Sequence, residues 1–368
     1  MRAAIFTEHG GVDKISIGDF PDPECGPADA VIKVNAVSLN GFDPMILGGT
    51  TGLPTPFPMI PGGDFAGEIV ELGGDVKGWT VGDRVCPHPF VPGEGMTGET
   101  RLGAASEYTR IPATHLIRLP DGVSDDDAAA LPIAYGTAYR MMLTRGKVGA
   151  ADTVLILGAT GGVGTCCVQL AKAAGAKVIV TGSAKWKLDK LQELGADHVI
   201  DTSREDLVKA CHAIAGKPHM GLAGDSGGGA DVIINYIGGE TWAQSLRCLK
   251  PDGRMLTCGA TAGYAPPTDI RYIWTYEQNI IGSNGWTMEE QVAVLDMVDT
   301  KALTPVIYAA RPLDQIAPSI QELIDRVIVG KTIIRPGERG GSSNTPPSMP
   351  PNSGCRRRPG SRRPLAPA

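Results

Sequence analysis

The segment Asp152-Thr-Val-Leu-Ile-Leu-Gly-Ala-Thr-Gly-Gly-Val-Gly164 runs from a short apolar stretch directly into a glycine-rich turn. The consecutive aliphatic residues from Val154 to Leu157 are typical of a strand that is buried on both faces of a parallel sheet. A helical pattern follows from Val163 to Ala174. Strand, turn and helix in this order predict the start of a βαβ unit whose turn binds a phosphate group.

The turn has the spacing of a dinucleotide-binding fingerprint, with alanine where the first glycine usually stands. Gly161 would let the backbone approach a pyrophosphate, and Gly164 would let the helix pack close to the strand. Amide groups and the positive dipole end of the helix would then hold the anion. A purely structural βα turn is the alternative. We predict coenzyme contacts along the turn, at Ala159, Thr160, Gly161, Gly162, Val163 and Gly164.

Length and composition narrow the class of protein. A chain of 368 residues favours two domains, and 42% apolar with 20% charged residues is ordinary for a globular protein. The net charge of -6 gives no reason to expect a nucleic-acid partner. No run of about eighteen apolar residues occurs, and Met1 to His9 lacks the apolar core of a signal peptide. We expect a cytoplasmic protein that acts on a small-molecule substrate without a membrane partner.

The composition and the hydrophobic pattern of the sequence change along the chain. The first part is rich in glycine and proline and contains alternating strand patterns, for example Ala30 to Val37 and Glu68 to Leu72, which indicate an irregular β-barrel. Ser124 begins a helix with an acidic first turn, and a second helix follows from Tyr135. The segment 306–334 is predicted to return to the first domain. Between these parts, strands at Lys177–Thr181, His198–Ile200, Asp231–Ile234, Arg254–Cys258 and Asn279–Gly282 alternate with helices over Lys185–Leu194, Arg204–Ala215, Thr241–Leu249 and Met288–Val298.

This alternation predicts an α/β fold with a doubly wound parallel sheet. The predicted limits are 1–125 with 301–336 for the barrel domain and 126–300 for the coenzyme domain. Residues 337–368 form a basic tail rich in proline, glycine, serine and arginine, which cannot bury enough apolar surface to fold and is predicted to be disordered. The eight cysteines are scattered, so we expect buried thiols rather than a disulfide framework.

Four segments together resemble the medium-chain dehydrogenase/reductase superfamily. They are the glycine turn, Gly62-Gly-Asp-Phe-Ala-Gly-Glu-Ile-Val70, Val81-Gly-Asp-Arg-Val85 and Gly330-Lys-Thr-Ile-Ile-Arg-Pro336. The resemblance covers roughly residues 1 to 336. It implies a GroES-like catalytic domain that is interrupted by a Rossmann coenzyme domain, with the active site in the cleft between the two.

The presence or absence of zinc ligands indicates the branch of the superfamily, because the superfamily contains zinc-dependent alcohol dehydrogenases and zinc-free quinone or enoyl reductases. On the superfamily pattern, Asn40 replaces the first cysteine ligand, Gly63 replaces the histidine ligand, and a third ligand position falls near Ile133. Cys86-Pro-His88 is a lone pair, and no close cysteine tetrad follows it. The resemblance therefore implies the zinc-free branch, whose Asn-Pro-x-Asp segment is similar to Asn40-Gly-Phe-Asp43.

The preference for one coenzyme follows from charge at the end of the second strand of the coenzyme domain. An NAD site usually has Asp or Glu there to hold the ribose hydroxyls. This chain has Thr181-Gly-Ser-Ala-Lys-Trp-Lys187, which contains no acid. A hydroxyl and an ammonium, from Ser183 and Lys187, would bind a 2′-phosphate, although the same residues could also be an ordinary solvated helix start. We therefore predict NADPH.

The leading hypothesis is an enzyme that reduces an activated double bond or a quinone with NADPH, passing hydride to the β-carbon and a proton to the α-carbon. Asn40 and Thr137 are predicted near the nicotinamide and the substrate. Tyr135 is a candidate proton donor, with packing in the core as the alternative. By resemblance, the nicotinamide pocket includes Gly259, Ile281 and Ser283.

Two other functions stay open from the sequence. One is an alcohol dehydrogenase or carbonyl reductase of the same superfamily. The other is a coenzyme-binding protein with a non-enzymatic role, because Gly48-Gly-Thr-Thr-Gly52 lacks the tyrosine that many relatives carry shortly after the Asn40 segment. The resemblance also implies a possible homodimer through the sheet edge near Ile280.

Overall fold

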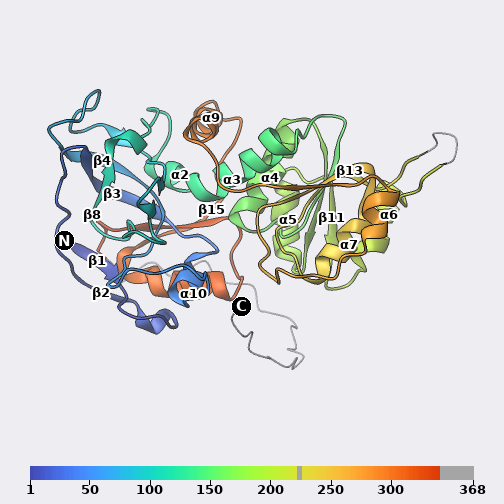
Figure 1. Cartoon of the computed structure of the whole chain (residues 1–368), viewed down its shortest axis with the longest axis horizontal. Coiled ribbons are helices and arrows are strands. Elements are labelled where there is room, and N and C mark those ends of the chain that lie inside the picture. The colour runs from blue at the N-terminus through green and yellow to red at the C-terminus, as the bar shows by residue number, and fades with distance from the viewer. Residues whose placement is uncertain (222–225, 340–368) are drawn as a thin grey trace.

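The computed structural model describes residues 1–221 and 226–339, and its two large six-stranded sheets lie side by side (Figure 1). We call the unit that carries the parallel sheet the coenzyme domain, and the unit that carries the other large sheet the barrel domain. The remainder of the predicted tail, residues 340–368, lies outside the described residues. No helix within the described ranges is both long enough and apolar enough to cross a membrane.

The coenzyme domain contains a six-stranded parallel sheet in the order β11-β10-β9-β12-β13-β14. From β9 the chain first adds β10 and β11 on one side of the sheet, and it then adds β12, β13 and β14 on the other side. The strand order therefore reverses between β9 and β12. Such a switch point is where open α/β sheets bind their ligands. The strands are β9 Thr153–Ile156, β10 Lys177–Gly182, β11 His198–Asp201, β12 Ala230–Ile234, β13 Leu249–Thr257 and β14 Asn279–Gly282.

Helices cover both faces of this sheet. Val154 and Ile156 of β9 pack with α4 and α5 on one face, and Leu155 packs with α6 and α7 on the other. Both faces are therefore dry, which explains the uniformly apolar strands and confirms the predicted doubly wound fold. The helices are α4 Gly162–Ala173, α5 Lys185–Glu193, α6 Leu207–Ala215, α7 Glu240–Cys248, α8 Ile270–Thr275 and α9 Met288–Asp299.

The barrel domain is built around a second six-stranded sheet. Its strands are hydrogen-bonded in the spatial order β15-β16-β3-β4-β5, and β8 pairs with β3 as well. Its apolar core includes Phe6, Ile32 and Phe65. Its elements are β1 Arg2–Ile5, β2 Ser16–Asp19, β3 Asp29–Ser38, α1 Asp43–Leu47, β4 Asp64–Leu72, β5 Arg84–Val85, β6 Phe90–Val91, β7 Gly95–Met96, β8 Tyr108–Pro112, β15 Ile307–Pro312, α10 Ile316–Ile324 and β16 Lys331–Arg335.

The end of the described chain returns to the first domain, as the sequence predicts, because β16 pairs antiparallel with β3. A helical connection, α2 Asp125–Ala129, η3 Pro132–Gly136, α3 Thr137–Tyr139 and η4 Arg140–Arg145, lies between the two sheets (Figure 1). Ser124 caps α2 by accepting a hydrogen bond from the Asp127 amide. The exact domain limits stay a prediction.

Several elements differ from the expectation. The strand β13 begins at Leu249 rather than Arg254, because Leu249 pairs with Ala230 before a bulge shifts the register. The helix α6 begins at Leu207 rather than Arg204, since the Asp206 side chain caps it. The short helices α1 and α8 were not predicted, because five or six residues are too few to show a helical period.

Gly164 offers a test of the packing at the glycine turn. A Cβ at this position would lie 2.5 Å from the Ala159 Cα, inside a rigid backbone. We expect Gly164→Ala to lower the free energy of unfolding by about 1–3 kcal/mol, measured by urea denaturation. The matched control is Gly161→Ala, whose Cβ would meet no atom within 4 Å and whose φ of -79° suits alanine. This control should stay within about 1 kcal/mol of the wild type, and equal losses in both variants would contradict the argument.

Candidate active site between the two domains

A buried polar cluster lies where the barrel domain meets the glycine turn. The ammonium of Lys331 donates a hydrogen bond to the Asn40 Oδ1 and lies 3.7 Å from the Asp64 Oδ2. The Asn40 Nδ2 donates to the same Asp64 oxygen at 2.9 Å, and the Ile133 amide donates to the other one at 2.9 Å. Lys331 and Asp64 are 2% and 0% exposed, so each charge depends on the other.

Asp43 extends this cluster with a second carboxyl group. Its Oδ2 accepts a hydrogen bond of 2.6 Å from the Asn40 amide nitrogen, whereas its Oδ1 is buried without a hydrogen-bond partner. Burial raises the pKa of Asp43 to about 7 and that of Asp64 to about 6, and it lowers the pKa of Lys331. The two carboxyl groups therefore change protonation near neutral pH, which is the range in which general acids and bases work.

The cluster is joined to the glycine turn through Lys331 and its neighbour. A Cβ on Gly162 would lie 2.6 Å from the Lys331 Cδ and 3.1 Å from the Ala134 Cβ, so the lysine stem runs directly over the start of α4. The Gly330 amide donates to the Thr160 carbonyl at 2.9 Å. A glycine at position 162 is therefore required by a side chain from the other domain.

The turn itself is open on the side where a coenzyme would approach. No atom lies within 4 Å of the space that a Cβ on Gly161 would fill. The first amides of α4, at Gly162 and Val163, have no acceptor inside the helix. Ala159 is buried and packs against Gly164, which brings α4 close to β9. These features fit the pyrophosphate of a dinucleotide.

The three predicted catalytic residues have different surroundings. Thr137 lies one turn after Ile133 on the connection between the sheets, and its side chain is half-buried. Tyr135 is fully buried, and its hydroxyl accepts a hydrogen bond of 2.9 Å from the Val306 amide. These contacts favour the alternative of packing in the core, and the proton-donor role of Tyr135 stays a prediction. Both ends of the Asn40 amide are occupied by Lys331 and Asp64, so direct contact of Asn40 with a substrate stays a prediction.

The residues predicted to hold a 2′-phosphate lie at the end of β10. Ser183 is exposed there. The Lys187 ammonium donates to the carbonyl groups of Arg326 and Ile328, and burial together with the Arg326 guanidinium lowers the pKa of Lys187. Lys187 is therefore tied to the segment that leads into β16, which the sequence did not reveal.

The predicted nicotinamide residues lie together at the carboxyl ends of β13 and β14. Gly259 and Ser283 line a hollow of about 470 Å³, with Ile281 on the adjoining strand. Two arginines, Arg140 and Arg145, line the same hollow.

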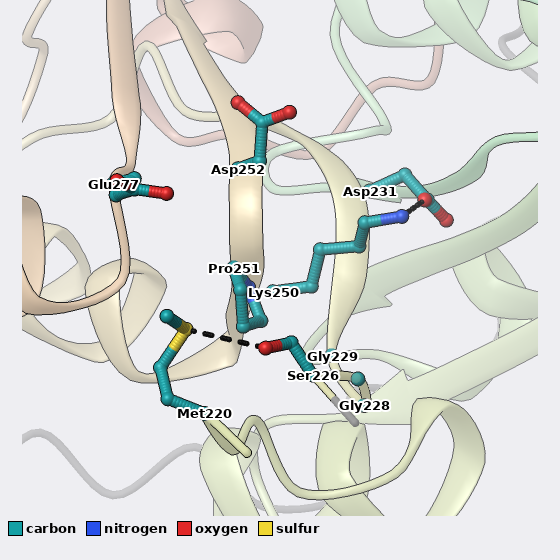
Figure 2. A pocket seen from close by; sticks show the side chains of 10 residues that line it. Met220, Ser226, Gly228, Gly229, Asp231, Lys250, Pro251, Asp252 and Glu277 are labelled. Carbon is teal, nitrogen blue, oxygen red and sulfur yellow. Dashed lines mark hydrogen bonds and ion pairs between the residues drawn. The ribbon is translucent and has the colours of Figure 1, made fainter. Parts of the chain in front are cut away.

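A second hollow, of about 370 Å³, lies at the opposite edge of the parallel sheet (Figure 2). It is lined by the Gly228-Gly229 segment and by residues near the amino ends of β12 and β13, where Lys250 forms an ion pair with Asp231. The edge that carries the glycine turn is at the carboxyl ends, so this second hollow is not part of the coenzyme site.

The residues at the expected zinc position do not fit a zinc ion. A Cβ on Gly63 would lie 2.8 Å from the Thr97 carbonyl oxygen and 3.0 Å from the Ile133 Cδ1, so protein atoms fill the space of the missing histidine. The Cys86 thiol donates to the Ala128 carbonyl, and burial raises its pKa. His88 contacts the carbonyls of Phe90 and Trp286. Within 1–221 and 226–339, no three His, Cys, Asp or Glu side chains converge as metal ligands.

Comparison with known proteins gives the class. A model of the alcohol dehydrogenase GroES-like domain matches residues 26–121, and a model of zinc-binding dehydrogenases matches residues 162–300. A zinc-type alcohol dehydrogenase-like protein of Schizosaccharomyces pombe is 30% identical over 352 residues, covering 91% of this chain and 99% of the relative. The crotonyl-CoA reductase of Streptomyces avermitilis is 28% identical, covering 88% and 83%.

A solved NAD-dependent alcohol dehydrogenase superposes with a TM-score of 0.83 at 27% identity, covering 92% of this chain and all of that one. The chain therefore belongs to the medium-chain dehydrogenase/reductase superfamily. It is an oxidoreductase of a class that works with a nicotinamide coenzyme.

Lys331 is a residue of the candidate site that sequence reasoning missed. The closing segment Gly330 to Pro336 was recognised as a motif, but no role was assigned to its lysine. A signal was present, because Lys331 precedes the apolar pair Ile333-Ile334 in β16, and a lysine that is buried with such a strand needs an acidic partner. The identity of that partner is visible only in the fold.

The buried cluster can be tested through stability. Lys331→Met removes the ammonium and leaves the Asp64 carboxyl group without its cation, so we expect a loss of about 3–5 kcal/mol in the free energy of unfolding. Adding Asp64→Asn in the same chain should restore most of this loss. Lys190→Met, which breaks the exposed pair with Glu193, should change stability by less than about 1 kcal/mol. Equal losses in the single and double variants would exclude the charge pair as the cause.

The titration of Asp43 is expected to make the stability of the folded protein depend on pH. Its pKa rises from the ordinary value of 3.8 to about 7 on folding, so between these values the folded state holds a proton that the unfolded state has lost. Stability from this group is therefore present at low pH and falls as the pH rises to about 7. We expect the wild type to lose up to about 1.4 kcal/mol per pH unit relative to Asp43→Asn between about pH 5 and 7. Urea denaturation across this range measures the difference, and parallel pH curves would refute it.

Proposed function

We propose that this protein is an NADPH-dependent reductase that transfers a hydride to an activated double bond or a quinone without zinc. The observation that carries the proposal is that Asn40, Gly63 and Ile133 stand where the superfamily pattern has zinc ligands, and that Asn40 is held in a buried cluster with Asp64 and Lys331. A metal-free site has no Lewis acid to stabilise an alkoxide, which simple alcohol oxidation needs. A conjugated acceptor is reduced without that alkoxide, because the charge develops on an enolate oxygen.

Bound NADPH would supply the hydride in this reaction. The chain itself contributes a glycine turn that anchors the pyrophosphate. It also contributes an apolar surface beside this turn, formed by Ala134 and the aliphatic stem of Lys331. Thr137 would present a hydroxyl from the connection between the domains. Burial raises the pKa of Asp43 to about 7, whereas Asp64 stays paired with the Lys331 ammonium, and the two carboxyl groups keep the Asn40 segment in a fixed position through the Asn40 amide nitrogen and side chain. The catalytic roles of Asn40 and Thr137 belong to the proposal.

The proposed reaction is tested by following NADPH loss with a panel of quinones, enones, enoyl thioesters and simple aldehydes, together with metal analysis. Reduction of the conjugated acceptors by a zinc-free enzyme is the expected result. The structural similarity to an alcohol dehydrogenase favours a second candidate, an alcohol dehydrogenase or carbonyl reductase. Stoichiometric zinc with oxidation of simple alcohols would establish that candidate instead, and tight NADPH binding without turnover would indicate a non-enzymatic role.

The NADPH preference rests on charge at the end of β10. Ser183 is exposed, no acid occurs from Thr181 to Lys187, and the cationic groups of Lys187 and Arg326 lie near one another. A 2′-phosphate would meet a hydroxyl and positive charge there, whereas an NAD site would present a carboxylate.

Ser183→Asp places a carboxylate at this position. We expect it to lower the ratio of kcat/KM for NADPH to that for NADH by at least about tenfold, because like charges repel at short range. Ser16→Asp in β2, on the other domain, is the matched control and should leave the ratio unchanged. An unchanged ratio in Ser183→Asp would overturn the assignment of the phosphate site.

The proposal also includes the cytoplasm as location and a homodimer. The strand β14 is the last in its sheet, and Ile280 on it is exposed, so the edge is available to a second copy. Sedimentation at the mass of a single chain would contradict the dimer.

A further inference from the structure

A tryptophan lies where the connection between the domains, the barrel domain and the segment after β14 come together. We propose that the indole of Trp286 is a wall of the substrate pocket and limits the size of the group that an acceptor carries on its β-carbon. This inference rests on the proposed function. It adds a specificity-determining residue that belongs neither to the glycine turn nor to the Lys331 cluster.

The indole of Trp286 bridges the connection and the barrel domain. A Cβ on Gly136 would lie 2.6 Å from the Trp286 Cδ1 and Cγ and 2.8 Å from its Cδ2, so the ring packs directly on the connection, one residue before Thr137. The ring centroid lies 5.1 Å from that of the His88 imidazole, which belongs to the barrel domain. The rest of the ring is exposed, since Trp286 is only half-buried.

A buried amide fixes the indole in this place. The Trp286 Nε1 donates to the Gln291 Oε1 at 3.0 Å, and the Gln291 Nε2 donates to the Cys86 carbonyl at 3.1 Å. Gln291 is 0% exposed, so water does not compete for these bonds. Trp286 also directly precedes Thr287, which caps α9. A ring held by packing and by a hydrogen bond presents the same surface to every ligand.

The position of Trp286 in the chain relates it to the hydride. Ser283 and Asn284 line the hollow that we predict for the nicotinamide, and Trp286 follows Asn284 after one glycine. Two residues span at most about 7 Å of extended backbone. Hydride passes from the nicotinamide to the β-carbon, so the β-carbon is the acceptor atom that comes closest to this hollow. A substituent on that carbon would extend toward the indole.

The indole has little freedom to move away from such a substituent. The Gly136 backbone is in contact with the ring on one side, and rotation of the ring would break its bond to Gln291. A large group on the β-carbon therefore meets a fixed surface, whereas a hydrogen atom in the same place does not. Because overfilling a rigid site is unfavourable, the pocket should favour acceptors whose β-carbon is unsubstituted.

Two enones test this inference. Methyl vinyl ketone has an unsubstituted β-carbon, and benzalacetone carries a phenyl ring there. We expect Trp286→Ala to raise the ratio of kcat/KM for benzalacetone to that for methyl vinyl ketone at least about tenfold. Trp286→Phe keeps a ring in this place and should change the ratio less than about threefold. Trp274→Ala, which removes a 69% exposed indole on α8, is the matched control and should leave the ratio unchanged.

Gly136→Ala tests the same contact from the opposite side of the ring. Its Cβ would displace the indole toward the substrate, so we expect the ratio to fall about threefold or more. Trp286→Ala in the same chain should abolish this effect of Gly136→Ala, because no indole is left to displace. An equal effect of Gly136→Ala with and without the indole would contradict the proposed contact.

Calorimetry of benzalacetone binding in the presence of NADP⁺ gives a readout that does not depend on turnover. Trp286→Ala should bind benzalacetone about tenfold more tightly than the wild type or Trp286→Phe does. Thermal denaturation verifies that each variant is folded. An unchanged or lower ratio in Trp286→Ala, with benzalacetone bound no more tightly, would overturn the inference and leave the proposed reductase intact. Failure to reduce any conjugated acceptor would instead overturn the proposed function, and the calorimetry would then decide on Trp286 by itself.

Discussion

A lysine ammonium that is removed from water is the constraint on which the rest of the structure depends. Lys331 lies at the start of β16 and is 2% exposed, so its charge requires partners inside the protein. Asp64 and Asn40 provide them from the end of β3 and the start of β4. The pairing keeps three segments together at one point, and a change to any of them leaves a buried polar group unsatisfied.

The same lysine connects the two domains. Its stem covers Gly162 at the start of α4, while its head contacts Asn40 in the barrel domain. Because the neighbouring Gly330 amide also bonds to the Thr160 carbonyl, the glycine turn is bound to the barrel domain through both backbone and side chain. The glycine turn and the Asn40 segment are in this way held in one fixed position relative to each other.

Much of the fold was predictable because its signals are local. Apolar strands, glycine turns and capped helices depend on neighbouring residues, and the parallel sheet followed from their alternation, including β9 and α4 almost to the residue. The position of Gly164 was also predictable, since only close packing of helix and strand calls for glycine there. The errors concern boundaries set by distant partners. The early start of β13 depends on Ala230, which lies on another strand.

The features of the candidate site also divide into those that follow from local sequence and those that depend on distant contacts. The sequence by itself determined the superfamily, and it predicted a dinucleotide turn without the usual metal ligands nearby, because each of these depends on residue type at a fixed spacing. Only the tertiary structure decided that Tyr135 braces the core against Val306, that Lys187 is bound to the carbonyls before β16, and that Lys331 meets Asn40. The last two residues are 291 positions apart, and no local pattern records which distant side chain will neutralise a buried charge. The partner of Lys331 is determined when the sheets pack, because burial makes an unpaired charge unfavourable and the fold decides which polar groups lie close enough to pair with it.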